Sequence, residues 1–334
     1  MFEFSAHTLA QIYLGLFGLA VLVYGILDGY DLGVGILLPM DNEQHRDTMV
    51  ASIGPFWDAN ETWLVLAVGL LLIAFPTAHS MVLQALYIPA SLMLLGLIIR
   101  GVAFDFRAKV KPVRKQLWDN AFKYGSLLTT LAQGYMLGMY VTGLDTSWYA
   151  HLFGVMAAFG VTAAYLFIGA CWLILKTSDD LQQLAYKWAK LGVYILSAGI
   201  AAVSLANVAL HDFVMQLWFS APSGLLLAAI PVTCFGLLVL CNLILSRLPK
   251  AAGQGEWLPF LIALLVFTLC FAGLGISYYP YVIPGVLKID DALAAPSSLT
   301  FLLAGALVVI PCILAYTVMV YRIFWGKAEK LSYY

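Results

Sequence analysis

Four of the acidic residues in the first fifth of the chain form two pairs with the same spacing. Asp28 and Asp31 form the first pair, and Asp58 and Glu61 form the second. Both pairs are spaced i and i+3, which places the two side chains on one face of a helix. Carboxyl groups gathered in this way can take up, hold and pass on protons. The spacing therefore makes these four residues candidates for a proton path.

Three basic residues, Arg100, Arg107 and Lys109, offer an alternative interpretation of the same acids. Opposite charges that meet at the end of a helical bundle can form a structural clasp. Because Gly54 and Pro55 precede the second acidic pair, a helix is expected to begin there, and the positive end of its dipole stabilises acids in its first turns. A clasp and a proton path are both open at this point, and one arrangement could serve as both.

The composition indicates that a membrane protein carries these residues. Of 334 residues, 63% are hydrophobic and only 10% are charged, whereas soluble domains are roughly half apolar and a quarter charged.

The net charge of -1 offers no basic surface for nucleic acid. The five cysteines form no CxxC pair, so neither disulfides nor a thiolate metal site is indicated. The apolar stretch after the first ten residues is too long for a signal-peptide core, and we expect a retained membrane helix.

Apolar stretches long enough to cross a bilayer recur along the whole sequence. About 20 apolar residues span the hydrocarbon core. The expected spans are 9–29, 55–75, 81–100, 122–144, 152–176, 190–210, 223–246, 257–277 and 299–323. The longest polar connection is expected at 101–121. The sequence therefore predicts an all-α membrane protein with nine transmembrane helices and no separate soluble domain.

The basic residues fall almost entirely on one side of the predicted helices. Cytoplasmic connections retain positive charge during insertion, and one side holds sixteen of the 17 basic residues, against Lys288 alone on the other. The sixteen are Arg46, Arg100, Arg107, Lys109, Lys111, Arg114, Lys115, Lys123, Lys176, Lys187, Lys190, Arg247, Lys250, Arg322, Lys327 and Lys330. The N-terminus is therefore expected outside and the C-terminus inside, with both acidic pairs at the cytoplasmic side.

The five histidines do not indicate a haem site. Axial haem ligands are normally His or Met side chains inside a helical bundle. The histidines instead fall near the ends of the predicted spans or outside them, and no two share a span at ligand spacing. They are His7, His45, His79, His151 and His211. We expect this chain to bind neither haem nor metal.

Three local strings resemble the second subunit of cytochrome bd-type quinol oxidases. They are GYDLGVGILLP at 29–39, GPFWDANETWLV at 54–65 and RGVAFDFR at 100–107. The middle string is the most specific, because this run at the opening of a membrane helix is rarely met elsewhere. The nine-helix layout extends the resemblance over the whole chain. The short length resembles the compact cyanide-insensitive branch, although the branch depends chiefly on the partner subunit.

The resemblance implies a fold and a complex. The fold would be one membrane domain, 1–334, with two four-helix bundles, about 9–144 and 152–277, and a peripheral final helix at 299–323. The partner would be subunit I in the bacterial inner membrane, which binds haems b and d, oxidises quinol and reduces dioxygen to water without pumping. Small single-helix accessory subunits, membrane lipids and a quinone or lipid bound to this chain are further expectations. No cofactor and no catalytic residue are expected in this chain.

The resemblance also gives the acidic residues a role. Asp58 and Lys109 match the family's positions for a cytoplasmic proton path, and Glu61, Asp31 and Asp28 could extend it. Besides a haem-carrying membrane cytochrome, against which the positions of the histidines argue, two alternatives stand. A secondary transporter would have inverted repeats with broken helices, and no matching pair of broken spans is present. A purely structural assembly subunit differs from a proton-conducting one in whether neutralising Asp58 slows turnover without loosening the complex.

Overall fold

The computed structural model describes residues 4–110, 112–220, 223–248 and 254–328, and most of these residues lie in helices. The long helices are α1 (Ala6–Leu37), α3 (Trp57–Ala74), α4 (Pro76–Lys109), α5 (Pro112–Val141), α6 (Trp148–Lys176), α7 (Asp179–Leu210), α9 (Ser223–Arg247), α10 (Leu258–Tyr278) and α12 (Pro296–Ile323). The short elements are α2 (Glu43–Ile53), α8 (Asp212–Phe219), α11 (Ile289–Ala292) and the antiparallel strands β1 (Tyr281–Ile283) and β2 (Leu287–Lys288). Three of the basic residues assigned to the inner side, Lys111, Lys250 and Lys330, lie outside the described residues.

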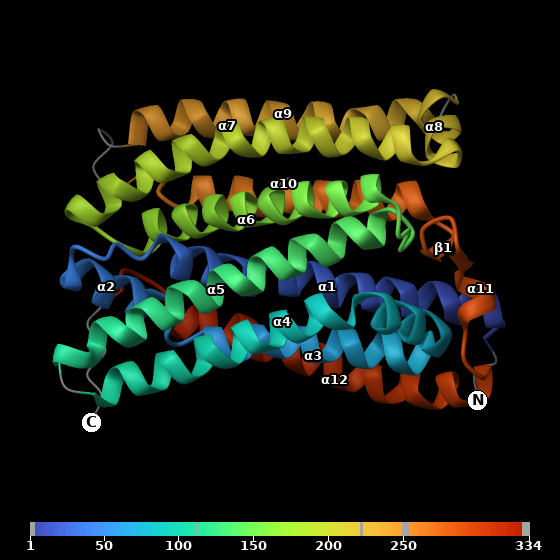
Figure 1. The fold of residues 1–334 in the computed structure, drawn as a ribbon, viewed down its shortest axis with the longest axis horizontal. Coiled ribbons are helices and arrows are strands. Elements are labelled where there is room, and N and C mark those ends of the chain that lie inside the picture. Colours follow the sequence, from blue (N-terminus) through green and yellow to red (C-terminus); the bar gives the residue numbers. More distant parts are fainter. Residues whose placement is uncertain (1–3, 111, 221–222, 249–253, 329–334) are drawn as a thin grey trace.

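Eight helices in the described part of the chain are long and apolar enough to cross a membrane. The ninth long helix, α5, has 30 residues and lies between α4 and α6 (Figure 1). It carries more polar side chains than the other eight, Asp119 and Lys123 among them. The prediction of an all-α membrane protein is confirmed, and only one short hairpin departs from it. The count of nine spans and the orientation stay predictions, with α5 as the ninth candidate.

The segment at 101–121 differs from the polar connection that the sequence predicted. It is mostly helical, because α4 continues to Lys109 and α5 begins at Pro112. Ala103 and Phe104 on this part of α4 are buried. Burial of these apolar side chains stabilises the helix beyond the span that hydropathy marks. The residues that follow Arg100 up to Lys109 therefore belong to α4.

The long helices run alongside one another in two groups (Figure 1). In one group α1, α3, α4 and α5 contact each other, and in the other α6 contacts α7 and α10 while α9 contacts α7 and α10. Contacts of α6 with α1 and α5 join the groups, and α12 lies against α1 and α3. Figure 1 places α2 and the C-terminal residues at one end, named the α2 end below, and the N-terminus, α8 and α11 at the other. The division into two bundles at the predicted boundaries stays a prediction.

The helix starts follow local capping chemistry. Ser5 caps α1 by accepting a hydrogen bond from the Thr8 backbone N–H, and Asn42 caps α2 in the same way. Proline occupies the first turn of α4, α10 and α12, where its missing N–H costs no helical hydrogen bond. The sequence-based prediction did not include α2, because its 11 residues are too few and too polar for a span. This short helix proves to carry part of an ionic network described below.

Two glycines bring α1 and α6 into backbone contact. A Cβ atom on Gly33 would lie 1.9 Å from the backbone oxygen of Tyr165, and one on Gly169 would lie 2.7 Å from the carbonyl carbon of Gly33. Such distances are far shorter than any van der Waals contact, so a side chain at either position forces the helices apart. Small residues allow this kind of close approach between membrane helices. The contact fixes the helix that carries Asp28 and Asp31 against the second group.

Gly33→Ala is expected to destabilise the protein by about 1–3 kcal/mol, because the new methyl group overpacks the contact between α1 and α6. The measurement is the midpoint temperature of thermal unfolding of the purified protein in detergent. Gly15→Ala is the matched control, since it lies on the same helix and its Cβ would meet nothing within 4 Å. Equal midpoints for the two variants would show that the two helices do not meet this closely.

Candidate functional site

A buried ion pair between α1 and α4 forms the centre of the candidate site. Arg100 donates from Nη1 to Asp28 Oδ1 at 2.6 Å, and the two side chains are 1% and 0% exposed. Glu61 on α3 lies at the edge of this pair, with its Oε2 3.9 Å from Arg100 Nη2 and its side chain 25% exposed. Three helices therefore bring two of the predicted acids to one predicted base.

Asp31 lies close to this pair and is held by a different neighbour. Its side chain is fully buried, and its Oδ2 accepts a hydrogen bond of 2.8 Å from Asn60 Nδ2 on α3. Its second oxygen, Oδ1, makes no hydrogen bond within the described residues. We name Asp28, Asp31, Glu61 and Arg100 the acid cluster. It contains three carboxyl groups and one guanidinium group.

The fourth predicted acid and the predicted lysine lie outside the buried part of the cluster. Asp58, in the first turn of α3, and Lys109, the last residue of α4, are exposed. Neither forms an ion pair in the described part of the chain. Asp58 precedes Glu61 by three positions, so both side chains share one face of α3. Asp58 thus stands on the surface next to the partly exposed member of the cluster.

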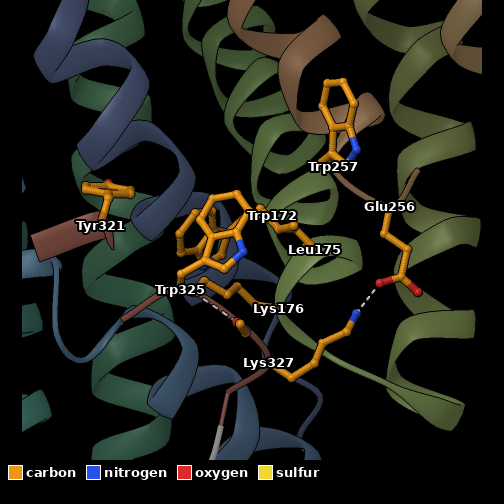
Figure 2. A pocket seen from close by; sticks show the side chains of 9 residues that line it. Trp172, Leu175, Lys176, Glu256, Trp257, Tyr321, Trp325 and Lys327 are labelled. Atoms are coloured by element: carbon orange, nitrogen blue, oxygen red, sulfur yellow. Dashed lines mark hydrogen bonds and ion pairs between the residues drawn. The ribbon is translucent and has the colours of Figure 1, made fainter. Parts of the chain in front are cut away.

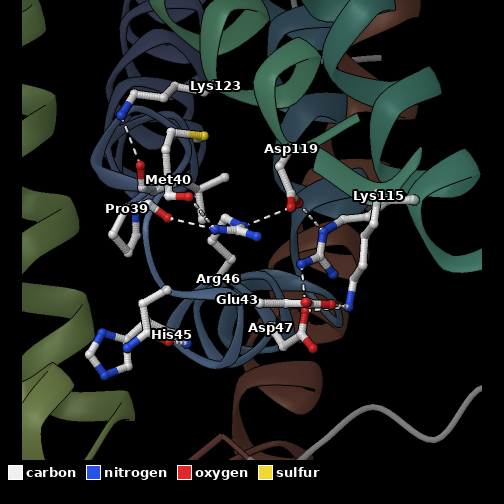
Figure 3. A network of polar contacts seen from close by, with 12 residues as sticks. Pro39, Met40, Glu43, His45, Arg46, Asp47, Lys115, Asp119 and Lys123 are labelled. Atoms are coloured by element: carbon white, nitrogen blue, oxygen red, sulfur yellow. Dashed lines mark hydrogen bonds and ion pairs between the residues drawn. The ribbon is translucent and has the colours of Figure 1, made fainter. Parts of the chain in front are cut away.

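A second charged network ties α2 to α4 and α5 at the α2 end (Figure 3). Asp119 on α5 is fully buried and accepts hydrogen bonds from Arg46 Nε at 2.7 Å and from Arg107 Nε. Arg107 also contacts Asp47 at 2.6 Å, and Lys115 contacts the same carboxylate at 2.6 Å. Arg46 further donates to the backbone oxygens of Pro39 and Met40. We name these five charged residues the clasp.

The clasp corrects one prediction from the sequence. The structural alternative from the sequence has Arg107 and Lys109 pairing with Asp28, Asp31, Asp58 or Glu61. In the structure Arg107 pairs with Asp119 and Asp47 instead. A helix continuing past Arg100 carries Arg107 about 10 Å further along the axis, at 1.5 Å per residue, beyond reach of Asp28. Sequence reasoning missed Asp119, although an acid beside a predicted span was a usable signal. Only Arg100 acts as a partner within the acid cluster.

The clasp also sets the charge state of Asp47. Partial burial raises the pKa of this carboxyl group, but hydrogen bonds and charge from Lys115 and Arg107 lower it more, so the net pKa lies below the ordinary value. A carboxyl group whose pKa falls on folding stabilises the folded state above its unfolded pKa, and this stabilisation is lost as pH falls through the lowered pKa. Asp47 is therefore ionised at neutral pH.

A cavity of about 200 Å³ opens at the α2 end between α6, the two residues before α10, and the end of α12 with the residues after it (Figure 2). Charged side chains of Lys176, Glu256 and Lys327 line it, together with Trp172 and Tyr321. Lys327 bonds to Glu256, as the dashed line in Figure 2 shows. The cavity is thus lined by both charged and aromatic side chains.

Three of the five histidine side chains contact protein groups near helix ends instead of gathering in the bundle. His7 Nδ1 lies 2.9 Å from Asp290 Oδ1, and His151 Nδ1 lies 2.7 Å from the Tyr135 hydroxyl. His211 Nε2 lies 2.6 Å from the Val141 backbone oxygen. Within the described residues no group of three or more His, Cys, Asp and Glu side chains could hold a metal ion. These contacts give the histidines structural partners.

Comparison with known proteins adds an independent line of argument. The family model described as cytochrome bd terminal oxidase subunit II matches residues 9–324. Cytochrome bd-I ubiquinol oxidase subunit 2 of Escherichia coli (strain K12) is 25% identical over 361 compared positions, gaps included. The comparison covers 94% of this chain and 94% of that protein. Cytochrome bd ubiquinol oxidase subunit 2 of Bacillus subtilis (strain 168) is 33% identical over 233 residues, which cover 65% of this chain and 68% of that protein.

A solved structure has the same fold. A chain in "The structure of bd oxidase from Geobacillus thermodenitrificans" superposes with a TM-score of 0.74. The match covers 95% of this chain and 98% of that one, at 20% sequence identity. At this level of sequence identity the similarity shows a shared fold and nothing more. The shared fold extends over nearly the full length of both chains.

Proposed function

The chain belongs to the family of cytochrome bd terminal oxidase subunit II, and from this premise we propose that it carries protons from the cytoplasm toward the oxygen-reducing haem of its partner. Family membership makes it a multi-pass membrane subunit of a quinol oxidase, an oxidoreductase complex of the respiratory chain that also contains subunit I. The proton path, the placement of the haems and the cellular membrane are our proposals.

We assign haems b and d to subunit I, and we place this chain without haem in a bacterial inner membrane with its α2 end in the cytoplasm. The histidines support the first assignment, because those of the described residues lie at helix ends and three of them already contact protein groups. Haem would need an axial His or Met inside the helical bundle. The same proposal includes quinol as the reductant, the reduction of dioxygen without proton pumping, and small single-helix accessory subunits.

An apolar groove between α1, α10 and α12 supports a bound lipid or quinone. It encloses about 590 Å³ and is lined by Leu27, Phe260, Leu264 and Val318, with Arg322 among the flanking residues. A long apolar tail would bury its surface against these side chains, and burial of each CH₂ group contributes about 0.8 kcal/mol. The groove therefore fits the tail that membrane lipids and quinones share.

The observation that carries the proton path is the position of the acid cluster. Asp28 and Asp31 are fully buried in a membrane-spanning helix, where ionisable groups are costly and commonly functional. The cluster opens to the surface at Glu61, and Asp58 stands exposed on the same face of α3. The arrangement is a surface acid, a half-buried acid and two buried acids in succession.

Each residue then has a distinct part. Asp58 collects protons at the surface, and Glu61 passes them toward the partner subunit. Arg100 pairs with Asp28, and Asp31 Oδ1, which makes no hydrogen bond within the described residues, accepts a proton without losing a hydrogen bond. Lys109 contributes positive charge at the mouth of the path, about 13 Å from Arg100 along the α4 axis, at 1.5 Å per residue.

Asp58→Asn is expected to slow quinol-driven oxygen consumption by roughly tenfold, equivalent to about 1.4 kcal/mol of barrier, because the amide keeps the shape but carries no proton. The purified complex should keep its haem spectrum and its subunit ratio. Asp180→Asn serves as the control, since Asp180 is also exposed, in the first turn of α7. Full activity in the Asp58→Asn complex would reduce Asp58 to a structural acid.

The clasp favours a second function, that of a scaffold for the complex. It buries Asp119 between two arginines at the α2 end and could fix the subunit in shape without any proton transfer. This alternative predicts that Asp58→Asn leaves turnover unchanged or acts only by loosening the complex. Since the family is established, the transporter alternative is no longer needed.

A further inference from the structure

A line of hydrogen bonds leads away from Asp31 and does not include the exposed acid Asp58. Asn60 Nδ2 donates both to Asp31 Oδ2 at 2.8 Å and to the Tyr30 hydroxyl at 2.9 Å. The Tyr30 hydroxyl lies 2.5 Å from the Tyr321 hydroxyl, which also donates to Asn60 Oδ1 at 3.4 Å. Two polar side chains, Asn60 and Tyr30, thus connect a buried carboxyl group on α1 to a tyrosine on the last helix.

The line ends at the polar cavity. Tyr321 lines the cavity of about 200 Å³ together with Lys176, Glu256 and Lys327 (Figure 2). Tyr30 is fully buried, whereas Tyr321 is only partly buried. A cavity of this volume, open to the surface and lined by charged groups, has room and partners for water. The line therefore joins a wet surface to the acid cluster without including Asp58.

Rigid neighbours hold both hydroxyl groups in place. The Tyr30 ring stacks on Trp172 with the centroids 4.2 Å apart, and the Tyr321 ring lies 4.6 Å from Phe56. The segment after α12 is fixed to α6, because Ala328 N–H donates to the Lys176 backbone oxygen at 2.7 Å. Aromatic stacking alone would be satisfied by phenylalanine, so the hydroxyl groups contribute something that packing does not require.

We propose that Tyr321 and Tyr30 form a second proton entrance, which leads from this cavity to Asp31 and operates in parallel with Asp58. The proposal rests on the proton-uptake function above. A hydronium ion in the cavity gives a proton to the Tyr321 hydroxyl as that hydroxyl gives its own to Tyr30, and Tyr30 in turn releases one toward Asp31. Each hydroxyl group gains one proton and loses one, so the net change is one proton moved from the hydronium ion, which becomes water, to Asp31.

The last step crosses a short gap. Tyr30 and Asp31 accept from the same amide nitrogen, so their oxygens are no further apart than the two hydrogen-bond lengths combined. One water molecule can bridge two oxygens at such a separation. Asn60 does not move the proton and acts as a positioning residue, since its amide fixes both oxygens around the gap.

The test compares Tyr321→Phe in two backgrounds of the complete two-subunit complex. If Asp58 carries most of the flux, Tyr321→Phe alone should slow oxygen consumption less than about twofold, but on the Asp58→Asn background it should slow the residual rate by roughly tenfold. Tyr30→Phe should behave in the same way. The matched control is Tyr316→Phe, which removes an exposed hydroxyl from the same helix and should change neither rate.

The outcomes separate this proposal from the proton function as a whole. The second entrance would be overturned if Tyr321→Phe had an equal, small effect on oxygen consumption in both backgrounds. It would also be overturned if the loss of oxygen consumption followed a lower unfolding temperature. Either result would leave Asp58 in its role. If Asp58→Asn has no effect but Tyr321→Phe alone slows turnover strongly, the role of Asp58 falls and the tyrosine entrance stands. No effect of any of these variants, singly or combined, would overturn both.

Discussion

Arg100→Met should lower the free energy of unfolding by about 3–5 kcal/mol, because it leaves Asp28 buried without the charge that compensates it. The guanidinium and carboxylate groups are 1% and 0% exposed, so water cannot replace either partner. Methionine fills much of the volume of the arginine stem, which limits the contribution of a cavity. The loss is therefore expected to come mainly from electrostatics.

The double variant Arg100→Met, Asp28→Asn tests this cause. It removes both charges of the pair, and replacing a buried ion pair by neutral groups is often close to neutral in stability. We expect it to recover most of the lost stability, measured as the midpoint temperature of unfolding of the purified complex by tryptophan fluorescence. A double variant no more stable than Arg100→Met would indicate that the arginine stabilises the bundle by packing.

Asp119→Asn should destabilise the α2 end by a similar amount, about 3–5 kcal/mol, because Arg46 and Arg107 then face each other around a neutral side chain. Asp119 is fully buried, whereas both arginines keep other partners, the backbone oxygens of the residues after α1 and the carboxylate of Asp47. The expected result is local opening of α2 before the rest of the protein unfolds.

Hydrogen exchange of the α2 amides in the purified complex measures this opening directly. The control is Asp47→Asn in the same network. Asp47 is 38% exposed, and ion pairs open to solvent contribute about 0–1 kcal/mol, so exchange should change little. Equal protection of α2 in wild type and Asp119→Asn would contradict the assigned role of the clasp.

The sequence left open whether its charged residues fasten helices together or carry protons. In the structure two separate networks, the clasp and the acid cluster, suit one role each. In the clasp each of the two acids contacts two of the three bases, as expected for ion pairs that hold helices together. The acid cluster has three carboxyl groups for one arginine, and Asp31 keeps an oxygen without a hydrogen bond. An excess of acids is unfavourable for a fastening but suited to a group that gains and loses protons.

The sequence by itself determined the class of fold and the region of the site. Spans of apolar residues mark helices because a bilayer leaves no other way to satisfy the backbone, and the predicted spans overlap the long helices closely. The i, i+3 spacing placed Asp28 with Asp31 and Asp58 with Glu61 on single helix faces, since that relation is local to one helix. The motif strings around these residues identified the family.

Only the tertiary structure decided which side chains meet. Arg100 and Arg107 lie two helical turns apart on the same face of α4, yet one pairs with Asp28 and the other with Asp119, because the offset of about 10 Å along the axis brings each to a different neighbouring acid. Tyr30 and Tyr321 are 291 positions apart and touch through their hydroxyl groups. No local pattern encodes such a contact, since it depends on how the first and last helices pack against each other.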